Sequence, residues 1–461
     1  MRTLTERLLG LLVILLLVRT TLLDGFPIPC QVHGGSMAET LLGPHYEVAC
    51  PDCGYSFACE AAAGGGGYQT VCPSCGCPVA SHEAPPEVAG DRVLIDKTAM
   101  ALGGPRRWEV IAFVHPTSKG EMVVKRVVGL PGETVAIRRG DLFINDRIQR
   151  KSLRQQRAMR ILVHDAGYEP AGYWPMIEPR VPSRWQGESA LGSGWQATGR
   201  GFRHSAPSGE KIDWLVYKHW QRGAKPGDIR ETPVTDVSSY NQGRPRRVED
   251  VHAMADVMVS VRVSEIRGDG RLWLRATDGL EEFQVAINPG RQDYAVFRKG
   301  QEAPVAQGSL PSPLGGQTVE ASLFDQQFLV AMGSRTLAAI PYDRGGGDLP
   351  SSPTPLAIGC EDLEAQLEDL EVYRDIYYGR PSSEEGAAAL ERGVRLGDNE
   401  LFVLGDNSPI SEDSRTWLDG PPVTASQIVG RPILVVFPAR SYSLGGVFFQ
   451  VPDPGRIRYI R

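Results

Sequence analysis

A serine and a lysine far apart in this chain are candidates for an activated nucleophile and its base. Ser36 stands in the segment GGSMAETL (34–41), and Lys125 stands in MVVKRVVG (122–129). A serine hydroxyl is a weak nucleophile until a base takes its proton. A lysine can be that base when burial lowers its pKa from about 10.4 towards neutrality.

The setting of Lys125 allows two interpretations. If residues 122–129 form a strand, Val123, Lys125 and Val127 share one face, because successive side chains point to opposite faces. On a buried face the amine is desolvated and can act as a general base at working pH. The alternative is a lysine on an edge strand whose ammonium reaches water. From this segment alone the edge-strand lysine is the favoured interpretation.

A third segment, LFVLGDNSPISEDSR (401–415), runs from apolar residues into a polar turn. Asp413 and Arg415 can pair and hold the turn. Ser411 or Ser414 can hydrogen-bond a neutral lysine and orient its lone pair. The alternative interpretation is an ordinary turn rich in Asp, Asn, Ser and Pro.

The amino-terminal residues predict a membrane anchor. Eleven apolar residues (8–18) follow Arg2 and Arg7, which is fewer than the roughly 20 of a usual spanning helix. Arg19 can extend to the membrane surface and so lengthen the apolar segment. A cleavable signal peptide and a buried helix are the alternatives, but no small-x-small cleavage pattern follows. Because basic residues stay cytoplasmic, the chain beyond the anchor is expected outside the cytoplasm.

The rest of the sequence predicts a mainly β fold, because short alternating apolar runs recur between Gly- and Pro-containing turns. In residues 151–394 such runs recur about every ten residues, which is typical of a β-sandwich. A helix is expected within residues 360–378. Core positions are expected for four tryptophans, with a sugar-binding platform as the alternative: Trp185, Trp195, Trp214 and Trp220.

The predicted organisation is one β domain with an amino-terminal anchor and two insertions. Its parts are the anchor (1–24), the discontinuous β domain (25–49, 88–150 and 395–461), a four-cysteine ribbon (50–80) and a β-sandwich-like insertion of unknown role (151–394).

The Ser36, Lys125 and 401–415 segments, in this order behind an anchor, resemble the type I signal peptidases, which are membrane-anchored Ser/Lys proteases. The resemblance covers roughly residues 1–49, 88–150 and 395–440. It implies a signal-peptidase-type β catalytic domain with Ser36 as nucleophile and Lys125 as general base. By the same resemblance Ser411 orients the lysine, and three residues structure the loop: Asp406, Asp413 and Arg415.

The resemblance also implies the reaction and its setting. Such enzymes remove signal peptides from exported preproteins after small-x-small sequences, through an acyl-enzyme and without a cofactor. The expected surroundings are membrane lipid and the export machinery, on the extracytoplasmic side of the cell membrane. Three departures bear on efficiency: Gly34 stands where some members have an oxyanion-binding serine, Glu39 replaces a proline, and Ser408 replaces an arginine.

Four cysteines in two paired motifs predict a metal site. Cys50 and Cys53 lie in CPDCG, Cys72 and Cys75 lie in CPSCG, and 18 residues separate the two pairs. This spacing is typical of a structural zinc site with four thiolate ligands. The alternative is a pair of disulfides, which an oxidising compartment favours.

Two other classes of function compete with a signal peptidase. One is a surface-anchored glycan- or protein-binding protein that carries a relic peptidase domain. The other is a self-cleaving Ser/Lys regulator, which would need a DNA-binding amino terminus instead of the leucine-rich segment. A net charge of −6 without a basic stripe argues against a nucleic-acid partner.

Overall fold

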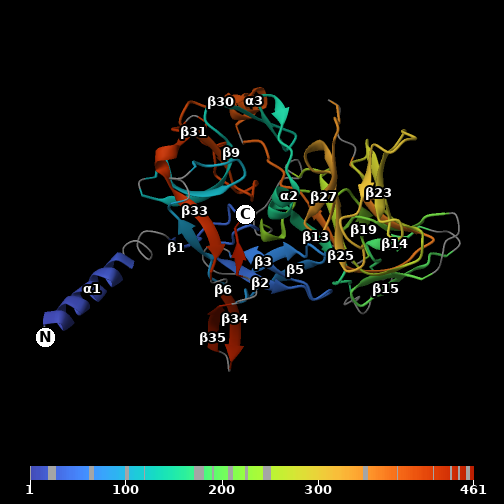
Figure 1. Ribbon diagram of the computed structural model, residues 1–461, viewed down its shortest axis with the longest axis horizontal. Helices are drawn as coiled ribbons and strands as arrows, with labels where there is room; N and C mark the ends of the chain where they lie inside the picture. Colours follow the sequence, from blue (N-terminus) through green and yellow to red (C-terminus); the bar gives the residue numbers. More distant parts are fainter. Residues whose placement is uncertain are drawn as a thin grey trace. The chain divides into compact units, whose positions relative to one another are not determined.

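The computed structural model is predominantly β, as predicted. It describes residues 2–18, 27–61, 67–98, 103–118, 120–170, 181–188, 192–205, 211–223, 227–241, 251–345, 351–381, 383–418, 420–436, 439–444, 447–452 and 457–460. The chain divides into two compact units (Figure 1). Unit 1 comprises Met1–Glu47, Ala84–Gln149 and Tyr378–Arg461, and unit 2 comprises Val48–Glu83 and Arg150–Tyr377. The predicted division into anchor, catalytic domain, ribbon and sandwich stays a prediction.

The elements of unit 1 are mostly short strands. They are α1 (Arg2–Val18), β1 (Pro27–Gln31), β6 (Glu87–Val88), β7 (Arg92–Asp96), β8 (Val110–Val114), β9 (Met122–Gly129), β10 (Thr134–Arg138), β11 (Asp141–Ile144), β12 (Arg147–Ile148), α3 (Glu384–Arg392), β30 (Val394–Arg395), β31 (Glu400–Leu404), β32 (Val423–Thr424), η5 (Ala425–Gln427), β33 (Ile428–Val435), β34 (Ala439–Leu444), β35 (Val447–Pro452) and β36 (Arg458–Tyr459). Strand β2 (His45–Ala49) crosses from unit 1 into unit 2.

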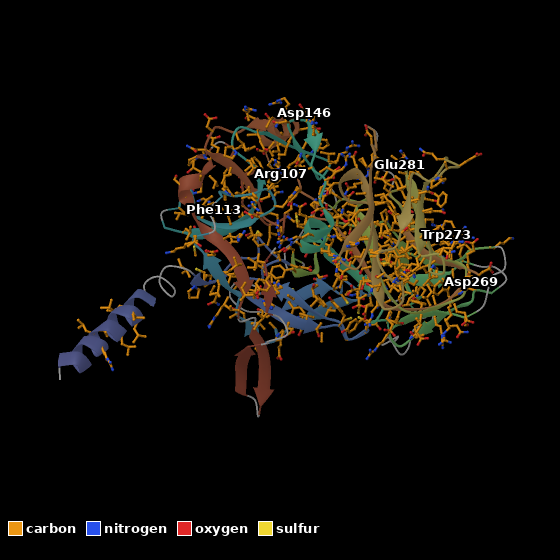
Figure 2. The ribbon with its side chains drawn as sticks, viewed as in Figure 1. Arg107, Phe113, Asp146, Asp269, Trp273 and Glu281 are labelled. Atoms are coloured by element: carbon orange, nitrogen blue, oxygen red, sulfur yellow. The ribbon has the colours of Figure 1, made fainter. Side chains whose placement is uncertain are left out.

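The main sheet of unit 1 places β9 in its interior. Its strand order is β1-β7-β33-β8-β9-β31-β32, and its pairings are antiparallel. Alternate residues of β8 enter different cores, because Ala112 packs with Met37 whereas Phe113 packs with Val127. Phe113 is labelled in Figure 2. Both faces of this sheet are therefore covered, and a polar side chain on β9 is withdrawn from water.

Unit 2 contains the four-cysteine segment and two large sheets. Its elements are β3 (Ser56–Glu60), β4 (Tyr68–Val71), β5 (Pro78–Ser81), α2 (Leu153–Met159), β13 (Ile161–Asp165), β14 (Trp185–Gly187), β15 (Trp195–Thr198), β16 (Gly201–His204), β17 (Asp213–Tyr217), β18 (Trp220–Arg222), β19 (Ile229–Glu231), η2 (Ser239–Asn241), β20 (Val257–Arg267), β21 (Arg271–Thr277), β22 (Glu282–Asn288), β23 (Asp293–Arg298), β24 (Ala306–Ser309), β25 (Gln317–Ser322), η4 (Phe324–Gln326), β26 (Gln327–Met332), β27 (Arg335–Pro341), β28 (Leu356–Glu361) and β29 (Glu364–Arg374).

The two large sheets of unit 2 share one hydrophobic core. One sheet has the order β15-β16-β29-β20-β25-β26-β27, and the other has the order β14-β17-β28-β21-β22-β23-β24. Core residues come from both, for example Val259 and Val319 from the first and Leu274 and Val285 from the second. Trp185 and Trp195 belong to this core and Trp220 is buried, as expected, whereas Trp214 is only half-buried.

The predicted helix within residues 360–378 is wrong, because this segment contains strand β29. Leu363, Leu367 and Leu370 have the spacing of a helical face, which explains the error. All three reach the core, Leu363 just before β29 and the other two within it. The register of β29 on β20 shifts between Glu368 and Glu371, and Asp369 in this bulge has a φ of 48°. The extra residue turns Leu370 back to the face that Leu367 occupies.

The amino-terminal helix α1 covers 17 residues of the predicted anchor, and residues 19–24 lie outside the described ones. Within the ranges that the structure describes, none of the helices has both the length and the apolar character needed to cross a membrane.

Candidate active site and a four-cysteine cluster

Ser36 lies in a turn that buried neighbours hold in place. The amide of Ala38 donates to the carbonyl of Gly35 at 3.1 Å. Met37 and Leu41 are buried in the core beside β8. Ser36 itself is half-buried. The turn thus keeps a serine side chain near the surface while its neighbours anchor the main chain.

Lys125 is a buried lysine on an interior strand. It lies on β9 opposite Ile111 of β8 and is 4% exposed. The edge-strand interpretation is therefore wrong, and the amine is withdrawn from water. Burial lowers the pKa of Lys125 to about 8, although the carboxylate of Asp413 opposes this effect. The Lys125 ammonium donates a hydrogen bond to Ser411 Oγ at 3.0 Å.

The turn after β31 brings Ser411 to the lysine because an ion pair holds its shape. Arg415 donates to both carboxylate oxygens of Asp413, at 2.9 and 2.8 Å. Burial favours the neutral acid, but Arg415 holds the pKa of Asp413 below its ordinary value. Asp413 also accepts from the amide of Gly405 at 3.0 Å. Arg415 Nη1 donates to Ser408 Oγ at 2.6 Å, so the serine that replaces an arginine takes part in this network.

The same turn grips the Ser36 segment through Asn407. The Asn407 amide donates to the Ser36 carbonyl at 3.0 Å, and its side chain donates to the Gly35 carbonyl at 2.9 Å. Gly405 has no room for a side chain, because a Cβ there would overlap Ser411 Oγ and the Ser36 carbonyl oxygen. Gly405 therefore lets the Ser36 main chain and the side chain that contacts Lys125 approach from two sides.

Arg126 and Thr40 belong to this arrangement although the sequence analysis assigned them no role. Arg126 is fully buried and donates to both carboxylate oxygens of Asp406, at 2.8 and 2.5 Å. Thr40 Oγ1 donates to the same carboxylate at 2.5 Å. Asp406 thus ties the strand that carries Lys125 to the segment that carries Ser36. In the sequence, the signal for this role was the position of Arg126, a charged residue next to Lys125 in a valine-rich strand.

Comparison with known proteins matches two of the three segments that build this site. The family model described as signal peptidase, peptidase S26, matches residues 70–182 and 358–437. Signal peptidase I U of Bacillus subtilis (strain 168) is 36% identical over 67 residues, which cover 14% of this chain and 35% of that protein. Signal peptidase I of Leptolyngbya laminosa is 41% identical over 63 residues, covering 12% and 30%.

The predicted resemblance to the type I signal peptidases is confirmed. Over the matched segments the chain is similar to signal peptidases, the class of hydrolase that the resemblance implies. The chain spans about a third of the length of these signal peptidases. The match to the signal peptidase model includes Lys125 and the turn with Ser411, whereas Ser36 precedes it.

Likenesses to solved structures are weak. A carbohydrate binding module from Bacillus subtilis matches with a TM-score of 0.26 and 9% identity, over 41% of this chain and 95% of that one. The endo-β-1,3(4)-glucanase SCLam matches with a TM-score of 0.25 and 13% identity, over 54% and 97%.

The four predicted cysteine ligands converge in unit 2. The Sγ atoms of Cys50, Cys53, Cys72 and Cys75 all lie within 4.8 Å of one another, and each cysteine is a free thiol. The Cys50 and Cys75 sulfurs are 3.5 Å apart, and those of Cys53 and Cys72 are 3.7 Å apart. Zinc–sulfur bonds of about 2.3 Å in a tetrahedron would place the sulfurs about 3.8 Å apart. The cluster therefore has the size of a zinc–thiolate site.

The two halves of the cluster have matching backbones. In each half a glycine follows the second cysteine and donates its amide to the carbonyl of the first, Gly54 to Cys50 at 3.0 Å and Gly76 to Cys72 at 2.9 Å. Both glycines have positive φ, 76° and 69°. This conformation suits glycine and turns each chain sharply around its two thiols. The repeated geometry fits two knuckles of one metal site.

Proposed function

We propose that this chain is a membrane-anchored serine endopeptidase that removes signal peptides from exported preproteins. The observation that carries the proposal is the buried Lys125 amine, hydrogen-bonded to Ser411 in a turn that also grips the Ser36 segment. A lysine with a pKa of about 8 is partly neutral near physiological pH and can then accept a proton.

In the proposed mechanism, neutral Lys125 takes the proton of Ser36 as the Ser36 Oγ attacks the carbonyl carbon of a small residue. The resulting oxyanion collapses to an ester, and the peptide nitrogen leaves with the proton that Lys125 returns. Lys125 then takes a proton from water, whose oxygen attacks the ester, and Ser36 regains its proton. These steps need only the two side chains, the substrate and water.

Ser411 has a positioning role in this proposal. Its bond to Lys125 Nζ restricts rotation of a long, flexible side chain and aims the amine. In the structure the Lys125 bond is to Ser411, and the Ser36 hydroxyl is proposed to reach the amine when substrate fills the site. Such contacts often tighten only in the substrate complex.

We propose residues 1–24 as the membrane anchor, with the catalytic unit on the extracytoplasmic side near the export machinery. Large apolar side chains on α1 support this proposal, because Leu9 is 65% and Ile14 is 59% exposed. A row of exposed leucines is unfavourable in water and favourable in lipid. The basic residues Arg2 and Arg7 precede the row, as expected for a cytoplasmic end.

We also propose that the four cysteines hold a structural zinc ion, which would cross-link the two knuckles. Both knuckles are attached to the rest of unit 2. Asp52 pairs with Arg222 of β18 at 2.5 Å, and Ser74 Oγ donates to the carbonyl of Asp165 at 3.1 Å. The ion would therefore stabilise the ribbon against the two-sheet part, which we propose is the β-sandwich insertion.

The deciding experiment is cleavage of a purified preprotein in detergent micelles by the full chain, Ser36→Ala and Lys125→Ala. We expect cutting after a small residue by the parent and none by either variant. Ser426→Ala, at an exposed position of unit 1, is the matched control and should cut normally. A folded parent chain that cuts no preprotein would refute the proposal and favour a relic peptidase. Variants that cut like the parent would refute the roles of Ser36 and Lys125.

A further inference from the structure

One face of strands β21 to β24 in unit 2 carries side chains that the core does not use. Inward residues such as Leu272, Ile287 and Val296 belong to the shared hydrophobic core. Because strand side chains alternate, their neighbours point to the opposite face. That outer face lies on the sheet containing β28 and away from the core that the two large sheets share.

Cross-strand pairing sorts the outer residues into rows. One row is polar and contains Asn288, Asp293 and Ser309, in pairing order across β22, β23 and β24. The next row on the same face contains Trp273, Ala286, Ala295 and Gln307. A third row contains Arg275, Gln284 and Phe297.

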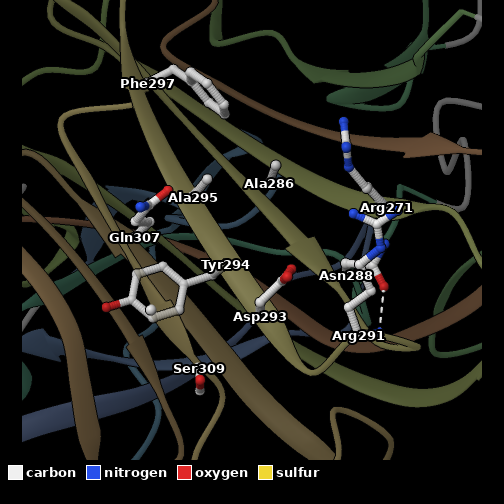
Figure 3. A pocket seen from close by; sticks show the side chains of 11 residues that line it. Arg271, Ala286, Asn288, Arg291, Asp293, Tyr294, Ala295, Phe297, Gln307 and Ser309 are labelled. Carbon is white, nitrogen blue, oxygen red and sulfur yellow. Dashed lines mark hydrogen bonds between the residues drawn. The ribbon is translucent and has the colours of Figure 1, made fainter. Parts of the chain in front are cut away.

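The middle row forms the floor of a hollow. Ala286 and Ala295 are small, whereas Asn288 and Asp293 on one side and Phe297 on the other are larger. The hollow has a volume of about 480 Å³, within the range of roughly 300–1,000 Å³ typical of small-ligand sites. Figure 3 shows Arg271, Arg291 and Asp293 towards one end of the hollow and Phe297 at the other.

Several polar groups around this hollow are available to a ligand. The side chains of Arg291, Asp293 and Gln307 make no hydrogen bond or ion pair with any residue that the structure describes. Asn288 is held in place, because its Oδ1 accepts from the Arg291 amide at 2.7 Å. Arg271 lies 3.8 Å from Glu361, too far for a strong ion pair.

We propose that this hollow binds an oligosaccharide that carries an anionic group. Hydroxyl groups need donors and acceptors side by side, and Asn288, Gln307 and Asp293 offer both. Arg271 has Glu361 as a distant counter-charge, whereas Arg291 has no ion pair among the residues that the structure describes, so its guanidinium is available to one carboxylate or sulfate on the ligand. Phe297, whose ring lies 6.0 Å from that of Trp273, gives an apolar wall for the face of a sugar ring.

A peptide ligand fits this face less well. Peptides gain affinity by pairing their backbone with a free strand edge, but the hollow lies over the paired strands β22 and β23. The lining is also mostly polar, without the deep apolar pocket that would anchor a side chain. An acidic peptide is therefore the competing outcome of the test.

The test uses the full chain in detergent on an array of neutral, uronate and sulfated oligosaccharides, followed by calorimetry with a galacturonic acid trisaccharide. We expect the anionic sugars to bind and neutral ones to bind at least tenfold more weakly. Ala295→Phe, which fills the floor, should abolish binding, and Arg291→Gln should weaken it at least tenfold. The matched controls Ala339→Phe and Arg335→Gln lie at exposed positions of β27 and should bind like the parent.

Three results would overturn the inference. They are no signal from any anionic sugar on the array, unchanged binding by Ala295→Phe, or equal binding of a glutamate tripeptide. Preprotein cleavage by the Ala295→Phe chain should be normal. A failure of sugar binding is therefore separable from a failure of the proposed peptidase activity.

Discussion

Lys125 Nζ and Ser411 Oγ lie 3.0 Å apart although 286 positions separate them in the chain. The contact is buried, and the ion pair of Asp413 with Arg415 holds the turn that carries Ser411. A lysine in water would need no such partner. The hydrogen bond to Ser411 therefore gives the buried Lys125 amine one specific orientation.

Cleavage should depend on pH through this lysine. Because the neutral amine is the active form, kcat/KM should rise with pH and level off above an apparent pKa of about 8. Ser411→Ala removes the acceptor that stabilises the ammonium, so the rise should move to lower pH. The maximum rate of the Ser411→Ala variant should fall about 10- to 100-fold, because the Lys125 amine is no longer held in one orientation. A pH–rate profile of each chain measures both effects, and an unshifted profile with a normal rate would assign Ser411 no positioning role.

Lys125→Met should make the chain more stable while it stops cleavage. The folded chain binds the lysine proton more weakly than the unfolded chain, because the pKa falls from 10.5 to about 8 on folding. This corresponds to roughly 3 kcal/mol of destabilisation that is fully present below pH 8 and disappears towards pH 10.5. Denaturant unfolding at pH 6.5 and 9.5 should show the advantage of methionine shrinking as pH rises. If the stability advantage of Lys125→Met stays constant with pH, burial does not lower the pKa of Lys125.

Gly405→Ala should disable cleavage without touching a reacting group. The added Cβ would overlap Ser411 Oγ and the Ser36 carbonyl, so the turn and the Ser36 segment must separate. We expect a loss of at least about 100-fold in kcat/KM, the scale on which misplaced catalytic groups act. Gly103→Ala, where a Cβ meets no heavy atom within 4 Å, is the control. Equal activity of the two variants would contradict the close approach.

Asp406→Asn should weaken the fold, because it leaves the fully buried Arg126 without its counter-charge. Breaking a buried ion pair in this way costs about 3–5 kcal/mol. The control is Asp146→Asn, whose partner Arg138 lies at the surface and whose own side chain is 79% exposed (Figure 2). That change should cost less than about 1 kcal/mol. Urea unfolding of both variants distinguishes the two sites, and similar losses would argue against a structural role for the buried pair.

Metal removal should loosen unit 2. We expect about one zinc per chain by elemental analysis, no zinc in Cys72→Ser, and a lower midpoint of thermal unfolding for that variant. Cys30→Ser, outside the cluster, should keep its zinc. Titration of free thiols in the denatured chain tests the alternative. If the four cysteines form two disulfides, they will not react and the chain will contain no zinc.

Much of this protein follows from local sequence. Strands such as β7 and β20 lie where alternating apolar residues predict them, because the alternation of a strand is a property of adjacent residues. The cysteine cluster follows from its spacing, since each CxxCG segment makes its own turn. The order of the Ser36, Lys125 and Ser411 segments was enough to recognise the signal peptidase relation.

Other features depend on residues that meet only in the folded chain. Lys125 is buried and not solvent-exposed because β9 is an interior strand of its sheet. The eight residues of β9 do not by themselves encode that position. Arg126 acquires a role only because Asp406, 280 positions away, lies opposite it. Likewise, the bulge at Asp369 lets leucines with helical spacing lie on one face of a strand. Burial and charge pairing depend on contacts between residues that are far apart in the sequence. Such contacts therefore decided the environment of each candidate site residue.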